Sequence, residues 1–181
     1  MQTFAITSMG RSGTRFLASI LHSSFDWIVK HEPYDGFQTT EEVQARFNSF
    51  AGYFQYGEVN SFLRGNILEL VTDYKAIILR DPLQIFQSMY NRKKPRLRHL
   101  IESLHQLDVA IGKGIPTIAF SQMIVNRDYL QQVALNAGVC LDQTPNLTPK
   151  NTSLHYAMPP KLLGEAQQKL QWFTDKYRSL W

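Results

Sequence analysis

The side chains best suited to chemistry gather in residues 9–16, where an apolar stretch passes through a glycine-bracketed turn into an expected helix. Gly10 and Gly13 allow the positive φ angles and the close backbone approach of a tight turn. Free N–H groups at the start of a helix, together with the helix dipole, bind anions. The segment therefore predicts a phosphate site, with a purely structural turn as the alternative. The charged and hydroxyl side chains of the turn are Arg11, Ser12, Thr14 and Arg15.

The turn matches neither of the two common phosphate-binding motifs. Counting from Gly10, the second glycine of G-x-x-x-x-G-K-[ST] would fall at Arg15, and no Gly-Lys-Ser/Thr tripeptide occurs in the chain. The dinucleotide motif G-x-G-x-x-G fails because two residues separate Gly10 from Gly13. A nucleotide-dependent kinase of the P-loop class needs the lysine of the first motif, so the absence of that lysine argues against a kinase.

A second strand-to-helix junction lies in residues 75–91. Residues 76–79 form an unbroken apolar run that suits a strand buried on both faces. Asp81 is a good N-cap and Pro82 occupies the first helical position, so the helix start is well marked. Arg80 then lies at the carboxyl end of the strand, the edge where open parallel sheets bind ligands, and Ser88 follows two helical turns later. Two such junctions indicate a ligand with two separated phosphate groups.

Together the two motifs resemble those of one enzyme family. Residues 9–16, Met-Gly-Arg-Ser-Gly-Thr-Arg-Phe, resemble the 5′-phosphosulfate loop of the sulfotransferases that use 3′-phosphoadenosine 5′-phosphosulfate (PAPS). Arg80 followed eight residues later by Ser88, in an Arg-Asp-Pro context, is similar to the 3′-phosphate site of that family. The resemblance spans most of residues 3–140 and implies the P-loop NTPase-like sulfotransferase fold, with PAPS as cosubstrate and no metal.

The resemblance implies a role for each matching residue. Arg11 would contact the 5′-phosphate and the bridging oxygen that leaves during transfer, and Arg80 and Ser88 would hold the 3′-phosphate. Lys150 would stand in for a late Arg-Lys-Gly contact that this chain lacks. Met9 in place of proline and Arg15 in place of a hydroxyl residue depart from the family pattern. The remaining donor-binding residues would be Ser12, Gly13, Thr14 and Arg15 around the 5′-phosphate and Phe16 near adenine.

The general base is expected just after a second short strand, which residues 26–31 predict. Several sulfotransferases carry a glutamate at this place, so the resemblance implies that Glu32 is the base. His31 is the rival, because an ordinary histidine titrates near neutral pH whereas a carboxylate reaches that range only through burial or neighbouring charges. The remaining alternative is that His31 and Glu32 are both solvated turn residues without a catalytic role.

Length and composition favour a single α/β domain over residues 1–181, built as a three-layer sandwich around a central, mainly parallel sheet. Hydrophobic residues make up 44% of the chain, which excludes a generally disordered protein. We expect helices over residues 39–50, 58–72, 97–111, 128–137 and 162–177 and a strand over residues 116–120. Thr39 with Glu42 predicts a capping box.

The sequence also bears on partners and compartment. No 18-residue apolar run and no secretion leader occurs, so we expect no membrane span and a cytoplasmic protein. We expect the single cysteine, Cys140, to be a small core residue and not a nucleophile. No histidine has metal-ligand spacing with acidic or sulfur partners.

The net charge of +4 is unevenly distributed, because five basic residues lie in residues 92–98. This run could attract an acidic acceptor such as a sugar polymer or anionic lipid headgroup, or could be a solvated junction between helices. Nucleic-acid binding is not expected, because no recognised binding module accompanies the run.

The predicted activity is transfer of the sulfuryl group of PAPS to a hydroxyl or amine of a small-molecule or carbohydrate acceptor. The alternatives are the kinase and a non-catalytic module that binds 3′-phosphoadenosine 5′-phosphate (PAP) or another nucleotide. The identity of the acceptor and the oligomeric state are left open.

Overall fold

A computed structural model describes residues 2–33, 39–51, 54–61, 66–143, 146–147 and 156–180 of the chain. Its centre is a five-stranded sheet with the order β2-β3-β1-β4-β5, in which all neighbouring strands pair in parallel. This confirms the predicted α/β fold with a parallel sheet. The strands are β1 (Thr3–Ser8), β2 (Trp27–His31), β3 (Gln55–Ser61), β4 (Tyr74–Leu79) and β5 (Thr117–Ala119).

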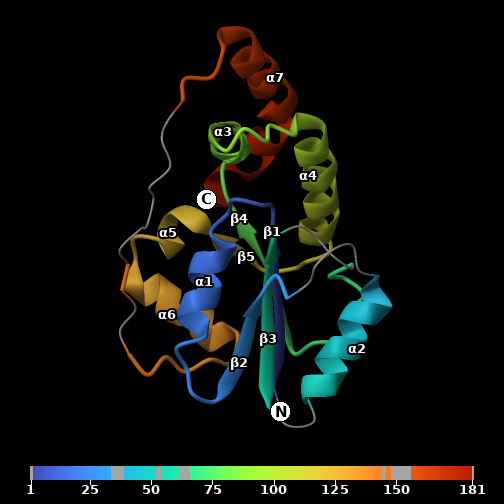
Figure 1. The fold of residues 1–181 in the computed structure, drawn as a ribbon, viewed down its shortest axis with the longest axis vertical. Helices are drawn as coiled ribbons and strands as arrows, with labels where there is room; N and C mark the ends of the chain where they lie inside the picture. The colour runs from blue at the N-terminus through green and yellow to red at the C-terminus, as the bar shows by residue number, and fades with distance from the viewer. Residues whose placement is uncertain are drawn as a thin grey trace.

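Helices cover both faces of the sheet (Figure 1). One face packs on α1 (Thr14–Leu21), α5 (Phe120–Met123) and α6 (Arg127–Asn136). The other face packs on α2 (Thr40–Ala51), α3 (Pro82–Asn91), α4 (Leu97–Gly112) and α7 (Pro160–Tyr177), which is followed by the 3₁₀ turn η1 (Arg178–Leu180). Among the described residues, no helix combines the length and the apolar character needed to cross a membrane.

The two-sided cover follows from the strand sequences. Every residue of β1 is buried, and successive side chains point to opposite faces of the sheet. Phe4 therefore joins the core beneath α1, whereas Ala5 joins the core beneath α2. Such continuous burial is typical of parallel strands with helices on both faces.

Local signals set the helix starts. At α3 the Asp81 carboxylate accepts a hydrogen bond from the Leu83 N–H at 2.8 Å, and proline follows the cap. At α2 the Thr39 N–H donates to Glu42 Oε2 at 2.9 Å, and the Glu42 N–H donates to Thr39 Oγ1 at 3.3 Å. The predicted capping box is therefore present.

Two local expectations were wrong. Residues 58–72 were expected to be helical, but residues 58–61 belong to β3 and residues 67–69 form a turn. Residues 62–65 lie outside the described residues. A contact from a distant segment fits β3 to the sheet. A Cβ atom at Gly57 would lie 2.1 Å from the ring of Phe4, its partner in β1, so glycine is needed for that ring to lie over β3. Cys140 is exposed and is not a core residue.

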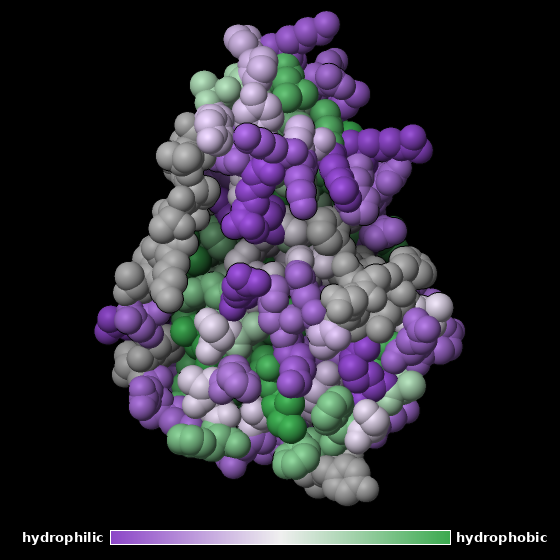
Figure 2. Space-filling model, viewed as in Figure 1, coloured by the Kyte–Doolittle hydropathy of each residue, from purple (hydrophilic) through white to green (hydrophobic). Residues whose placement is uncertain are grey.

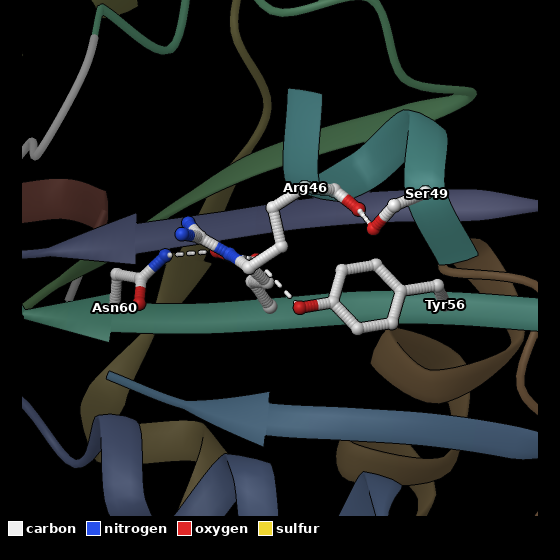
Figure 3. A network of polar contacts seen from close by, with 5 residues as sticks. Arg46, Ser49, Tyr56 and Asn60 are labelled. Atoms are coloured by element: carbon white, nitrogen blue, oxygen red, sulfur yellow. Dashed lines mark hydrogen bonds and ion pairs between the residues drawn. The ribbon is translucent and has the colours of Figure 1, made fainter. Parts of the chain in front are cut away.

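A buried ion pair joins α2 to the centre of β3 (Figure 3). The Glu58 side chain is fully buried, and its Oε1 accepts from Arg46 Nε at 2.7 Å and from the Tyr56 hydroxyl at 2.7 Å. Glu58 Oε2 accepts from Arg46 Nη2 at 3.3 Å and from Asn60 Nδ2 at 3.2 Å. These donors replace the water that the carboxylate loses on burial.

Replacing Arg46 by alanine should lower the free energy of unfolding by about 2–3 kcal/mol, because it leaves a buried carboxylate without its cation while Tyr56 and Asn60 still donate to it. Urea unfolding of the variant measures the loss. The double variant Arg46→Met with Glu58→Gln removes both charges and should recover most of it. A loss below about 0.5 kcal/mol in the single variant would contradict the structural importance of this pair.

Candidate functional site

Two strand-to-helix junctions lie next to each other at the carboxyl edge of the sheet. β1 and β4 are neighbours, with Ser8 opposite Ile78 near their ends, and the Ser8 hydroxyl donates to the Ile78 carbonyl at 2.9 Å. The chain continues from β1 through residues 9–13 into α1, and from β4 through residues 80–81 into α3 (Figure 1). The two predicted phosphate motifs therefore open at the same edge, where parallel sheets bind ligands.

The first junction is a turn with a strained backbone. Arg11 has φ 76° and Gly13 has φ 82°, both in the left-handed region. A Cβ atom at Gly13 would lie 2.7 Å from the Phe120 ring, so this position requires glycine. The buried Ser12 hydroxyl has no hydrogen-bond partner among the described residues, and no side chain caps α1. An anion in the turn would satisfy both the hydroxyl and the first N–H groups of the helix.

Two arginines tie the junctions together. Arg11 Nε donates to the Ser88 hydroxyl in α3 at 3.2 Å, and Arg80 Nη1 donates to the Arg11 carbonyl at 2.7 Å. Arg80 Nε also donates to Gln84 Oε1 at 3.3 Å, and its guanidinium lies 4.3 Å from the centroid of the Phe120 ring. The loop after β1 and the helix after β4 therefore form one connected site.

The site carries an excess of positive charge. Burial lowers the pKa of Arg11, and the neighbouring charges of Arg92 and Arg15 lower it further. Burial also lowers the pKa of Arg80, with a contribution from Arg11. None of the ion pairs formed within the described residues includes Arg11, Arg15 or Arg80. Because guanidinium groups stay charged at neutral pH, this arrangement favours binding of an anion with more than one negative charge.

His31 is the last residue of β2 and Glu32 follows it, with β3 between this strand and β1 in the sheet. His31 Nε2 is 3.1 Å from Thr14 Oγ1, the first residue of α1. Glu32 has φ 47°, and its Oε1 accepts from the Ser61 N–H at 3.1 Å at the end of β3. Both side chains are therefore held at the edge where the two junctions open.

Burial lowers the pKa of His31, Glu32 opposes this effect, and Arg15 adds to it. The imidazole is therefore neutral at neutral pH, and the 3.8 Å between His31 Nε2 and Glu32 Oε1 is a contact between a neutral ring and a carboxylate. A neutral imidazole and a carboxylate can each accept a proton from an acceptor molecule at this edge.

No protein-family model and no curated protein sequence matches the chain significantly. Solved structures do match. A sulfotransferase from Alicyclobacillus acidocaldarius superposes with a TM-score of 0.65 at 15% identity, covering 99% of this chain and 95% of that protein. A mouse sulfotransferase in complex with PAP superposes with a TM-score of 0.56 at 14% identity, covering 98% of this chain and 85% of that protein. The chain has the sulfotransferase fold.

Within the sulfotransferase fold, the described structure brings most of the predicted site residues together. Arg11, Arg80 and Ser88 are joined by hydrogen bonds, and His31 meets Thr14. Of the other predicted site residues, Arg15 is exposed on α1, Phe16 packs partly buried against the core beneath α1, and Lys150 lies outside the described residues. The roles of all the predicted site residues stay predictions.

Two residues of the site were missed by the sequence analysis. Gln84 follows Arg80 by four residues, so helical spacing alone could have identified it as a neighbour. Phe120 contacts both Arg80 and the Gly13 turn from the end of β5, and no local signal in the sequence indicates that contact. Phe120 positions the arginine of one junction against the turn of the other.

Proposed function

We propose that this chain is a sulfotransferase that moves the sulfuryl group of PAPS to a hydroxyl or amine of a small-molecule or carbohydrate acceptor and releases PAP. The observation that carries the proposal is the pair of joined junctions, in which Arg11 and Arg80 lie together without a carboxylate partner among the described residues. A mouse protein with the same fold was solved with PAP, which carries two separated phosphate groups.

The residues present fit such a donor. The unpartnered Ser12 hydroxyl and the uncapped start of α1 suit the 5′-phosphate, and Arg11 suits the bridging oxygen beside it. Arg80 and Ser88 suit the 3′-phosphate, because a guanidinium and a hydroxyl both donate hydrogen bonds to phosphate oxygens.

The proposed reaction is a direct displacement. The acceptor oxygen or nitrogen attacks the sulfur, a new S–O or S–N bond forms, and the S–O bond to the 5′-phosphate breaks with its electrons going to PAP. Arg11 and the loop N–H groups stabilise the charge that develops on the leaving oxygen. Glu32 takes the acceptor proton, because its Oε2 hydrogen-bonds no described residue while Oε1 is held by Ser61. His31 is the second candidate base.

Calorimetric titration with PAP, ADP, and ATP with and without magnesium tests the proposal. We expect a clear preference for PAP. A magnesium-dependent preference for ATP would instead support the kinase. Hydrolysis of PAPS by the wild-type protein separates an active enzyme from a non-catalytic PAP-binding module, since water can replace the acceptor.

Replacing Arg80 by alanine should weaken PAP binding by roughly ten- to a hundredfold, because a charge-assisted hydrogen bond to phosphate contributes about 1.5–3 kcal/mol. Binding of adenosine 5′-phosphate, which lacks the 3′-phosphate, should change far less. The control is Arg98→Ala, which removes the same charge from an exposed ion pair on α4. Equal losses of affinity for both nucleotides would show that Arg80 stabilises the fold or binds a part of the ligand other than the 3′-phosphate.

A further inference from the structure

A row of polar side chains runs along α3 at intervals of four residues. Arg80 precedes the helix, Gln84 and Ser88 lie one and two turns further on, and Arg92 is the C-cap. The backbone of Arg92, at φ −95° and ψ 12°, still donates hydrogen bonds to the carbonyls of the last turn. Residues four apart are neighbours on a helix surface, so Arg92 lies beside Ser88, while the row as a whole winds round the helix by about 40° at each step.

The contacts of this row show which way it faces. Arg80 Nε donates to Gln84, and Ser88 accepts from Arg11 in the turn after β1. Arg92 is close enough to Arg11 that its charge lowers the pKa of Arg11, an effect second only to burial. Arg92 is exposed and belongs to none of the ion pairs within the described residues. Its guanidinium is therefore available to a ligand beside Ser88.

The basic residues that follow Arg92 leave the row. Lys93 has φ 58°, which turns the chain out of the helix, and the Lys93 and Lys94 N–H groups donate to the carbonyls of Tyr90 and Met89 at 2.8 and 3.1 Å. Figure 2 shows strongly hydrophilic residues gathered over α3 and its connection to α4. Of the three neighbouring cations at residues 92–94, Arg92 alone keeps the helical spacing from Ser88.

We infer that Arg92 binds the 3′-phosphate of the donor nucleotide, on the side of Ser88 opposite Arg80. This inference rests on the proposed function. A phosphate monoester carries close to two negative charges at neutral pH, whereas the proposed function assigns it a single cation, Arg80, with Arg11 assigned to the 5′-phosphate side. A second guanidinium one turn beyond Ser88 completes the neutralisation and would make the 3′-phosphate the main determinant of nucleotide choice.

The test is calorimetric titration of the wild type, Arg92→Ala and Lys94→Ala with PAP and with adenosine 5′-phosphate. Lys94→Ala is the matched control, because it removes one positive charge two residues away and outside the row. We expect Arg92→Ala to weaken PAP binding about tenfold and to leave adenosine 5′-phosphate binding within about twofold. Lys94→Ala should change neither affinity by more than about twofold, and thermal unfolding of both variants should match the wild type because both side chains are exposed.

Three results would overturn the inference. They are an unchanged PAP affinity in Arg92→Ala, an equal loss of affinity for both nucleotides, and a loss in Lys94→Ala that matches that of Arg92→Ala, which would indicate a general charge effect. A wild type that binds PAP no better than adenosine 5′-phosphate would overturn the proposed function itself and the inference with it. A wild type that prefers PAP, with no change on losing Arg92, overturns the inference alone.

Discussion

Replacing Glu32 by glutamine is expected to lower turnover by about 10²–10⁴-fold while PAP affinity stays nearly unchanged, because a positioned general base contributes that much to proton transfer. The Glu32 backbone is left-handed, with φ 47°, and its carboxylate is held through one oxygen by the Ser61 N–H. The substitution keeps the shape of the side chain and removes its capacity to accept a proton. Turnover with PAPS and a working acceptor, beside PAP titration, measures both quantities.

His31→Ala is the companion variant. If Glu32 is the base, His31→Ala should reduce turnover only modestly, through the loss of its contact with Thr14. If His31 is the base instead, His31→Ala abolishes turnover and Glu32→Gln does not. In that case protonation of His31 should slow the wild type at low pH. Because burial lowers the pKa of His31, this fall in rate should come at a pH below the ordinary histidine value of about 6.5. Turnover that survives both substitutions would remove both residues from proton transfer.

Replacing Arg11 by alanine is expected to lower turnover by about 10²–10³-fold and to weaken PAP binding by no more than about tenfold. The reason is that the interaction of Arg11 strengthens as the leaving oxygen gains charge, so more is lost in the transition state than in the bound state. Steady-state turnover at saturating PAPS and calorimetry with PAP separate the two effects.

The strained backbone at Arg11 makes a control necessary. Alanine and arginine meet the same steric cost at φ 76°, so the substitution should leave the free energy of the turn itself nearly unchanged. Arg11→Lys keeps the charge but loses the donor geometry that reaches Ser88, and it should recover part of the turnover. Unchanged turnover in Arg11→Ala at saturating PAPS would exclude Arg11 from the mechanism.

The sequence by itself determined the parts of this protein that depend on short-range interactions. The cap of α3 depends on Asp81, Pro82 and Leu83, and the start of α2 depends on the reciprocal bonds of Thr39 and Glu42. The same holds for the two strand-to-helix junctions, whose glycines, caps and apolar runs are continuous in the chain. Short-range signals of this kind are readable because every partner lies within one helical turn or one strand.

The tertiary structure decided what depends on distant partners. The sequence predicted a helix over residues 58–72, yet Glu58 lies in a buried strand, where Arg46, twelve residues away, supplies its counter-charge and Phe4 packs over Gly57. Likewise, the sequence indicated two separate phosphate motifs, whereas the fold joins them through Arg11 and Ser88, which are 77 residues apart. The pairing of β1 with β4 brings these side chains together, and no pattern within either segment encodes that distance.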